Sequence, residues 1–404
     1  EGGMTVGEFS VDVAAWAATY HALVGFVMPL FAVGMVVYFF GDPDDRSLAP
    51  AWEVAPLCLA SGIAFAVPYW ISAWFLTAEF PSLIGSMVGG AIILSILRAG
   101  YLLPDDEWEF PEREKWADHW VGSIEPGQSN GSNGGDAESR GGVSPEAEAA
   151  DLSGGEDMGL LKAWSPYVLL VVLLVVTRAV APISNFINRD IFIISWTDIL
   201  GTSLNGAVAW MNVPGFWLLV SAVLAIPIFG MSGEEVGDAW KEAARKIVSP
   251  FIALVFVIAM VQVMLQSGAH PGAPEVGSMI VLLAQTTADL LGPAYPAFAS
   301  LIGALGAAMA GSNTVSNITF GAFQFEAATQ LGLPRTIIVG AQAVGGAIGN
   351  LVAIHNLVAA LATVGLLGQE GRVMRLNLIP LLYYATGVGL LCLLFSYVLF
   401  PGVF

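Results

Sequence analysis

The sequence contains few charged residues for its length. Asp, Glu, Lys and Arg make up 12% of the 404 residues, against 56% for the hydrophobic types, and the mean hydropathy is +0.73. A soluble domain carries roughly a quarter charged residues. A charged fraction this small cannot cover a water-exposed surface. The composition therefore excludes an ordinary soluble globular protein and indicates lipid as the main solvent.

Basic residues are scarce, and lysine is the rarest of the charged types. Lys and Arg together number 14 against 33 Asp and Glu, which gives a net charge of −19. The chain therefore lacks the basic surface that nucleic-acid binding requires. An acidic, lysine-poor surface is typical of proteins in high salt, where charge repulsion is screened. An ordinary acidic loop insertion would account for the same surplus.

Cysteine pairs and catalytic motifs are also missing. Cys58 and Cys392 lie in separate apolar runs, far apart in the sequence, so they form neither a CxxC pair nor a zinc spacing and are predicted to be packing residues. The chain has no Gly-rich phosphate loop, zinc signature or GxSxG elbow, so we predict no enzyme, cofactor or metal site. It begins at Glu1 without a charged segment before an apolar core, so we expect no cleavable signal peptide and a longer parent chain.

Long apolar runs dominate what is present. Each run is long enough to cross a ~30 Å hydrocarbon core as a helix, and the runs lack the period-2 alternation of barrel strands. Hydropathy predicts spans at 21–40, 54–76, 81–103, 163–183, 214–232 and 247–267, with further segments at 278–311, 312–334, 335–367 and 378–400. The predicted fold class is an all-α integral membrane protein, a polytopic helical bundle of about ten transmembrane segments with broken or re-entrant helices.

The predicted spans fall into two groups around one polar stretch. Residues 1–103 form a first membrane group of about three helices, and residues 162–404 form a second. Between them, residues 104–161 are acidic and rich in Gly and Ser, which predicts a solvated, partly disordered loop. In the second group, residues 191–212 are too short and polar for a span and are predicted to be interfacial or re-entrant. Residues 233–246 have acids first and bases last, which is typical of an amphipathic helix.

A polar stripe opens the segment after Gly311. Ser312 and Ser316 are four residues apart, as are Asn313 and Asn317, so a helix would carry all four on one face. Such side chains in a membrane face other helices or a cavity, and amides and hydroxyls can donate to a carboxylate. The stripe predicts a substrate or ion site. The alternative is a set of hydrogen bonds that only join helices.

The segment 335–367 is too long for one straight span, because 33 residues would extend about 50 Å as a helix. Its string GGAIGN, at 345–350, is the weak point, since glycine is poor in helix interiors and leaves backbone groups open to ligands. A break there would gather the polar and small residues Gln342, Gly345, Gly346, Asn350, His355 and Asn356 around one cavity. The alternative is a long tilted helix with a GxxxG contact.

Two titratable residues lie close to these segments. Histidine is the side chain whose ordinary charge change falls near neutral pH, so His355 would suit a proton-coupling group, although a hydrogen-bonded structural histidine is the alternative. Glu326 follows three phenylalanines, and a desolvated carboxyl favours its protonated form and could carry a proton. At the membrane surface the same residue would have no such role.

Several long strings resemble a known family. GSNTVSNITFGAFQFEAATQLGLP, QAVGGAIGNLVAIHN and ATVGLLGQEGRVMR, with AWSPY at 163–167 and WTDILGTS at 196–203, are similar to the L-lactate permease family. The resemblance covers most of the chain after the acidic loop and is only hydropathic before it. Members of that family extend further at the N-terminus, so we expect this chain to lack their N-terminal portion.

The resemblance implies a function. It implies proton symport of L-lactate and related 2-hydroxymonocarboxylates, such as glycolate, by a multi-pass protein of the cell (plasma) membrane, with the monocarboxylate, a coupling cation and lipid as partners. Under this hypothesis the stripe Ser312, Asn313, Ser316 and Asn317 and the residues gathered by the GGAIGN break bind substrate, while His355 and Glu326 carry the proton. The alternatives are a Na⁺-coupled or other organic-anion carrier, or a membrane subunit without transport of its own.

Overall fold

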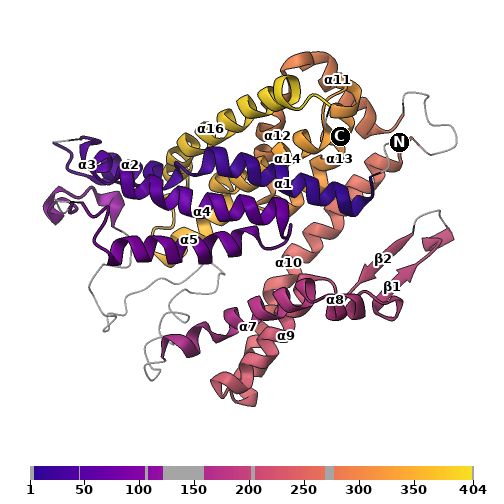
Figure 1. The fold of residues 1–404 in the computed structure, drawn as a ribbon, viewed down its shortest axis with the longest axis horizontal. Helices are drawn as coiled ribbons and strands as arrows, with labels where there is room; N and C mark the ends of the chain where they lie inside the picture. The colour runs from indigo at the N-terminus through magenta and orange to yellow at the C-terminus, as the bar shows by residue number, and fades with distance from the viewer. Residues whose placement is uncertain are drawn as a thin grey trace. The chain divides into compact units, whose positions relative to one another are not determined.

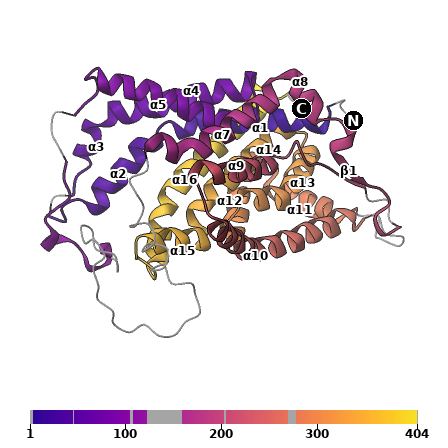
Figure 2. The ribbon, with the colours of Figure 1, turned by 90° about the horizontal axis from the view of Figure 1, so that it is seen from below.

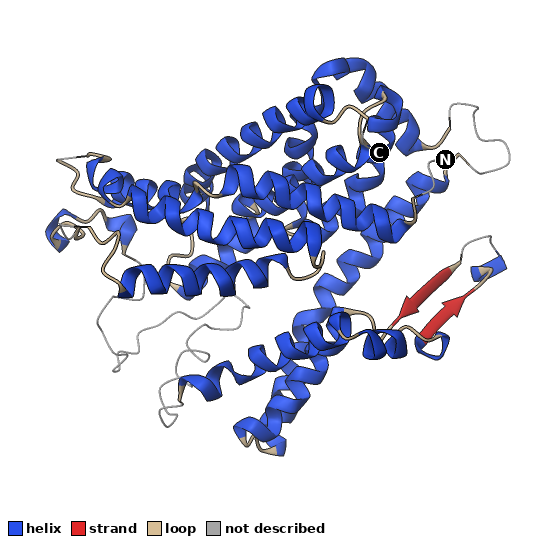
Figure 3. Cartoon of the chain, in the orientation of Figure 1, coloured by secondary structure: helices blue, strands red, loops and turns tan. Residues whose placement is uncertain are grey.

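A computed structural model describes residues 4–44, 46–104, 108–121, 159–201, 205–268 and 277–402. Most of the predicted acidic loop, at 105–107 and 122–158, lies outside these ranges, so its disorder stays a prediction. The chain divides into two compact units: Glu1–Asp136 with Ala253–Phe404, here called unit 1, and Ala137–Ile252, called unit 2. Helices dominate both units, as Figure 3 shows.

The described residues of the N-terminal half of unit 1 include five helices (Figure 1): α1 (Val6–Gly25), α2 (Met28–Phe40), α3 (Ala49–Glu53), α4 (Ala55–Phe75) and α5 (Pro81–Arg98). The 3₁₀ turns η1 (Arg113–Lys115) and η2 (Asp118–Trp120) follow. The predicted spans at 54–76 and 81–103 correspond to α4 and α5. The span predicted at 21–40 was wrong in extent, because α1 begins at Val6. Thr5 and Glu8 form a capping box that starts the helix there, a local signal that hydropathy does not contain.

The C-terminal half of unit 1 supplies most of its core. Its elements are α11 (Met279–Leu291), η6 (Gly292–Ala294), α12 (Tyr295–Ala310), α13 (Asn313–Leu331), α14 (Arg335–Ile348), η7 (Gly349–Val352), α15 (Ile354–Thr363), α16 (Glu370–Leu394) and η8 (Phe395–Leu399). The central helix is α14, whose side chains Ile337, Ile338 and Val344 are fully buried and which contacts α1, α12, α13 and α16. Figure 2 shows α14 between α1 on one side and α12 and α13 on the other.

Unit 2 contains α7 (Leu160–Ala179), α8 (Ala181–Ile187), η4 (Asp190–Phe192), β1 (Ile193–Trp196), η5 (Ile199–Gly201), β2 (Gly206–Ala209) and α9 (Pro214–Phe229). The strands pair antiparallel, with Ile193 opposite Ala209, so the stretch predicted to be interfacial or re-entrant forms a hairpin. The helix α10 (Gly233–Gln266) runs from unit 2 into unit 1. It joins the predicted amphipathic helix and the next predicted span, since a change from charged to apolar side chains does not interrupt helical backbone.

Four described helices are long and apolar enough to cross a membrane: Ala55–Phe75, Pro81–Arg98, Met279–Ala310 and Glu370–Leu399. Three bent pairs raise the number to seven if each is one span: Val6–Gly25 with Met28–Phe40, Lys162–Arg178 with Ala181–Ile187, and Arg335–Val352 with Ile354–Leu361. This number is lower than the about ten segments predicted, because α9 and the apolar end of α10 are short and α13 is polar. The all-α polytopic fold class is confirmed.

The segment predicted to break does so, and it also packs closely. The 3₁₀ turn η7 interrupts it at the end of GGAIGN, and the two halves are bent by 47°. A Cβ atom on Gly345 would overlap the Ser300 carbonyl oxygen of α12, and one on Gly349 would overlap that of Ala304. The predicted break is therefore confirmed and the single long tilted helix is wrong, although the close contact expected of the glycines is present: small residues let α12 and α14 approach before the helix breaks.

The close approach predicts different costs for two glycine substitutions. In Gly345→Ala, overpacking against Ser300 should destabilise the protein by about 1–3 kcal/mol. Gly321→Ala is the matched control, because a Cβ on Gly321 in α13 meets nothing within 4 Å; alanine there should be neutral or stabilise by up to ~1 kcal/mol. Thermal unfolding in detergent measures both variants, and equal midpoints would contradict the close packing.

Candidate functional site

Two helix breaks meet in unit 1. Gly311 ends α12 with a left-handed φ of +63°, and Ser312 caps α13 by accepting the backbone N–H of Val315 at 3.3 Å. The second break, η7, leads to α15, whose Asn356 amide donates to the Gly311 carbonyl at 3.4 Å. A Cβ on Gly311 would overlap the imidazole of His355. The break after α12 and the break after α14 are therefore neighbours.

The predicted stripe on α13 faces the surrounding helices. Ser316 is fully buried and donates to the Gly303 carbonyl of α12 at 2.7 Å. Asn317 donates from Nδ2 to Asn313 Oδ1 at 3.1 Å, and both side chains are half-buried. A Cβ on Gly346 of α14 would overlap Asn313 Oδ1, so this glycine leaves room for the amide. The structure thus brings the stripe against α12 and α14.

A buried glutamine joins the stripe to α14. Gln342 Nε2 donates to Ser316 Oγ at 3.1 Å and to Asn317 Oδ1 at 3.5 Å. Its Oε1 accepts from Gln324 Nε2 at 3.0 Å, and the Gln324 Oε1 accepts the Tyr295 hydroxyl at 2.6 Å. Both glutamines and the tyrosine are fully buried. The result is one continuous polar network across α12, α13 and α14.

Sequence reasoning named Gln342 but missed Gln324 and Tyr295. Gln324 lies eight residues after Ser316, which is two helical turns along the same face, so helix periodicity could have identified it. Tyr295 carries no comparable signal, because its hydroxyl meets Gln324 only through the packing of α12 on α13.

A second polar group surrounds the break at η7. Asn350 donates to the carbonyls of Gly346 and Ala347 at 3.4 Å each, and its Oδ1 accepts from Asn356 Nδ2 at 3.0 Å. Asn350 is half-buried, while His355 and Asn356 are exposed. Asn350, His355 and Asn356 therefore lie at the break, whereas Gln342 belongs to the network on α13. The single cavity shared by all these residues stays a prediction.

Glu326 lies apart from this site. It follows Asn313 by thirteen residues on the same helix, a rise of about 20 Å. Its carboxylate accepts from Gln330 Nε2 at 2.6 Å, close to the end of α13, where the guanidinium of Arg335 lies 5.2 Å from the ring of Phe325. The two predicted proton-coupling residues are therefore at opposite ends of α13.

The polar network is neutral where it is buried. Asn, Gln, Ser and Tyr side chains form it. The helix α13 begins after the break at Gly311, and α15 begins after the break at η7. Because these two breaks are neighbours, the positive ends of two helix dipoles lie close together. Such an arrangement can donate hydrogen bonds to an anion without burying a permanent counter-charge. Within the described ranges, no group of three His, Cys, Asp or Glu side chains could hold a metal ion.

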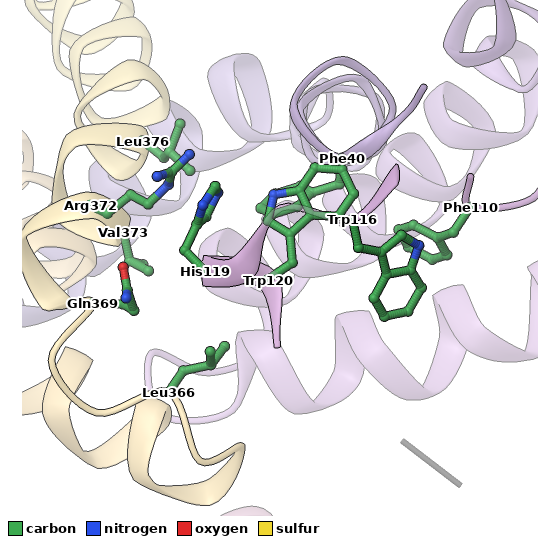
Figure 4. A pocket seen from close by; sticks show the side chains of 10 residues that line it. All are labelled: Phe40, Phe110, Trp116, His119, Trp120, Leu366, Gln369, Arg372, Val373 and Leu376. Atoms are coloured by element: carbon green, nitrogen blue, oxygen red, sulfur yellow. The ribbon is translucent and has the colours of Figure 1, made fainter. Parts of the chain in front are cut away.

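Positive side chains gather elsewhere in unit 1. One cavity has a volume of about 250 Å³. Figure 4 shows the side chains that line it: Phe40, Phe110, Trp116, His119, Trp120, Leu366, Gln369, Arg372, Val373 and Leu376. An adjoining cavity of about 420 Å³ shares Arg372 and adds Arg46 and Arg375. The ion pairs between described residues use none of these arginines. Nearby Lys115 lies 2.6 Å from Asp42, and this hydrogen bond lowers the pKa of the Asp42 carboxyl.

Known proteins similar to this chain are permeases. It is 26% identical over 394 residues to a putative L-lactate permease of Haemophilus influenzae, a match that covers 93% of this chain and 63% of that protein. It is 25% identical over 382 residues to an L-lactate permease of Bacillus subtilis, covering 88% and 61%, and 23% identical over 402 residues to the glycolate permease GlcA of Escherichia coli, covering 95% and 65%. The chain thus spans less than two thirds of the length of these relatives.

No solved structure matches the chain. The sequence profile of the L-lactate permease family, by contrast, matches residues 2–399, almost the whole length. This match extends the resemblance to the N-terminal helices, where the motifs alone had not reached. The apolar helices agree with a multi-pass protein of the cell membrane, and the family consists of transporters and not of enzymes. The chain therefore belongs to the L-lactate permease family.

Proposed function

We propose that this chain forms the substrate site of a carrier that moves L-lactate and related 2-hydroxymonocarboxylates, such as glycolate, across the cell membrane by proton symport. The names of the relatives, L-lactate permease and glycolate permease, support the substrate class. The observation that carries the proposal is the meeting of two helix breaks beside a neutral amide network. Carriers commonly build midplane sites from such discontinuous helices.

The chemistry of the substrate suits these groups. A 2-hydroxymonocarboxylate offers two carboxylate oxygens and one hydroxyl, and an amide side chain can donate to the former and accept from the latter. Asn317 donates to Asn313 in this structure, so a bound substrate would replace that hydrogen bond with hydrogen bonds of its own to the two amides. The residues proposed to line or support the site are Ser312, Asn313, Ser316, Asn317, Gln342, Gly345, Gly346, Asn350 and Asn356.

Within that set, burial separates direct from supporting roles. Asn313, Asn317 and Asn350 are half-buried, so their amides are within reach of a small ligand. Ser316 and Gln342 are fully buried, and Gln342 orients Asn317 by donating to its Oδ1. His355 lies at the break, and Glu326 at the other end of α13, which favours His355 as the proton-binding group of the two. The experiments below separate this proposal from three alternatives: a Na⁺-coupled carrier, a carrier of another organic anion, and a membrane subunit without transport of its own.

The amides of α13 should be needed for uptake. Asn317→Ala or Asn313→Ala should lower lactate uptake at least about tenfold with near-normal membrane abundance, since losing a hydrogen bond to a charged group costs about 1.5–3 kcal/mol. Asn188→Ala is the matched control, because Asn188 is exposed in unit 2 and its side-chain amide donates to the Ser184 carbonyl of its own helical turn. Normal uptake of labelled lactate by the Asn313/Asn317 double variant would remove the stripe from the site.

Replacing the proton-binding group should separate uphill uptake from exchange. His355→Gln should abolish pH-driven accumulation, spare exchange of bound lactate, and flatten the pH dependence of uptake between about pH 5.5 and 7.5. If Glu326 carries the proton instead, Glu326→Gln should have this effect, because it mimics the protonated form. Accumulation that survives both changes but follows a Na⁺ gradient would favour the Na⁺-coupled alternative.

The arginine-lined cavity should assist capture of an anion by a chain of net charge −19. Arg372→Gln should raise the KM for lactate several-fold at low ionic strength and leave the maximal rate unchanged. The effect should shrink in 1 M salt, where the Debye length falls to about 3 Å. Arg98→Gln is the control, since Arg98 lines neither of these two cavities. If the KM changes neither with Arg372→Gln nor with salt, the arginines have no role in capturing the anion.

A further inference from the structure

A third helix break in unit 1 lies one turn after a histidine, His21, that the proposed site does not use. The helices α1 and α2 form one apolar pair bent by 42° after Gly25. A cavity of about 280 Å³ adjoins this bend, and its lining residues are His21, Gly25, Met28, Phe65, Ala66, Tyr69, Ser82 and Tyr384. The cavity is therefore lined by residues of α1, α2, α4, α5 and α16, and it includes no residue of the breaks at Gly311 and η7.

His21 is held by a phenol from the other end of the chain. Its Nδ1 lies 2.6 Å from the Tyr384 hydroxyl oxygen, and its ring meets those of Tyr384 and Tyr69 edge-on at 5.7 and 6.2 Å. A Cβ on Gly25 would come within 2.7 Å of the same hydroxyl oxygen, so the glycine makes room for this pair. Tyr383 donates to the Val24 carbonyl at 3.1 Å, which ties α16 to the end of α1.

The position of His21 along the span is unusual for a titratable residue. It is fifteen residues after Val6, about 22 Å along a pair that continues to Phe40, and so lies near the middle. No carboxylate, lysine or arginine is among the residues that line its cavity; Tyr69, Ser82 and Tyr384 face it from α4, α5 and α16. The charged residue of α14, Arg335, lies over the Phe325 ring. An ionisable group in mid-membrane is costly and is most often functional.

The helix α16 connects this histidine to the proposed substrate site. Next to Tyr384, the Ala385 carbonyl accepts the Ser300 hydroxyl of α12 at 3.1 Å. About two turns from the start of the same helix, Asn377 donates to the Leu351 carbonyl of η7 at 2.7 Å. A movement of α12 or of η7 would therefore be transmitted through these hydrogen bonds to α16, which carries Tyr384, the hydrogen-bond partner of His21.

We propose that His21, hydrogen-bonded to Tyr384, binds and releases the transported proton, as a station of the same proton path as His355. On uptake, one N–H bond forms on the imidazole and one O–H bond of a hydronium ion breaks; release reverses this into water, and no electrons are transferred. A ring that alternates between hydrated and closed surroundings gains the proton in the first and loses it in the second. The inference rests on the proposed symport.

Reconstituted vesicles with an imposed pH gradient test the assignment. One pH unit can drive one-to-one proton symport to about tenfold accumulation of labelled lactate. His21→Gln should reduce this to about one, while lactate counterflow without a gradient stays within twofold of the unchanged protein. Tyr384→Phe should keep accumulation but shift its pH profile. Tyr397→Phe is the control and should leave the profile unchanged, because Tyr397 lies in η8, just after α16, and is exposed.

The outcomes are distinct. Tenfold accumulation by His21→Gln would overturn the assignment, as would loss of both accumulation and counterflow at normal abundance, because the histidine would then serve structure or substrate binding. If His21→Gln does not fold, an unshifted pH profile of Tyr384→Phe overturns it instead. If the unchanged protein shows no lactate counterflow, the proposed function fails and not this inference alone.

Discussion

A helix break inside a membrane exposes backbone carbonyl groups that lipid cannot satisfy, and the arrangement of unit 1 depends on meeting this requirement. Side-chain amides provide the donors. Asn356 reaches the Gly311 carbonyl, Asn377 reaches that of Leu351, and Asn350 turns back to Gly346. These amides come from α15, α16 and η7. The hydrogen bonds that satisfy the free backbone carbonyls therefore also fix which elements surround the break.

Glycine makes this arrangement possible by removing side chains at the contacts. The approach of α12 to α14 leaves no space for a Cβ on Gly345 or Gly349, and Gly346 leaves space for the Asn313 amide. The short distance between backbones brings Gln342 within hydrogen-bonding distance of Ser316. The same glycines therefore permit both the close helix packing and the buried polar network. A neutral network of this kind can exchange its internal bonds for those of an anion at lower cost than a buried ion pair could.

The bend between α1 and α2 repeats the principle with different residues. Here a glycine again makes room, for Tyr384, and a hydroxyl from α16 satisfies the Val24 carbonyl at the end of α1. The helix α16 thus touches both regions of broken helix, through Tyr383 and Tyr384 at one and Asn377 at the other. This shared helix offers a physical route by which proton binding and substrate binding influence each other.

Composition and periodicity by themselves determined the lipid solvent, the helical class, the stripe on α13 and the break at GGAIGN, because each follows from residues within one segment. Only the tertiary structure decided which partners those residues have. It put Glu326 some 20 Å along the helix from Asn313, joined Gln324 and Tyr295 to the network, and paired His21 with Tyr384, 363 residues away. Hydropathy also misplaced the start of α1 and divided α10, since helix ends depend on caps and backbone continuity rather than on apolar content. Pairings between distant segments arise from how helices pack, and no local pattern in one sequence records them.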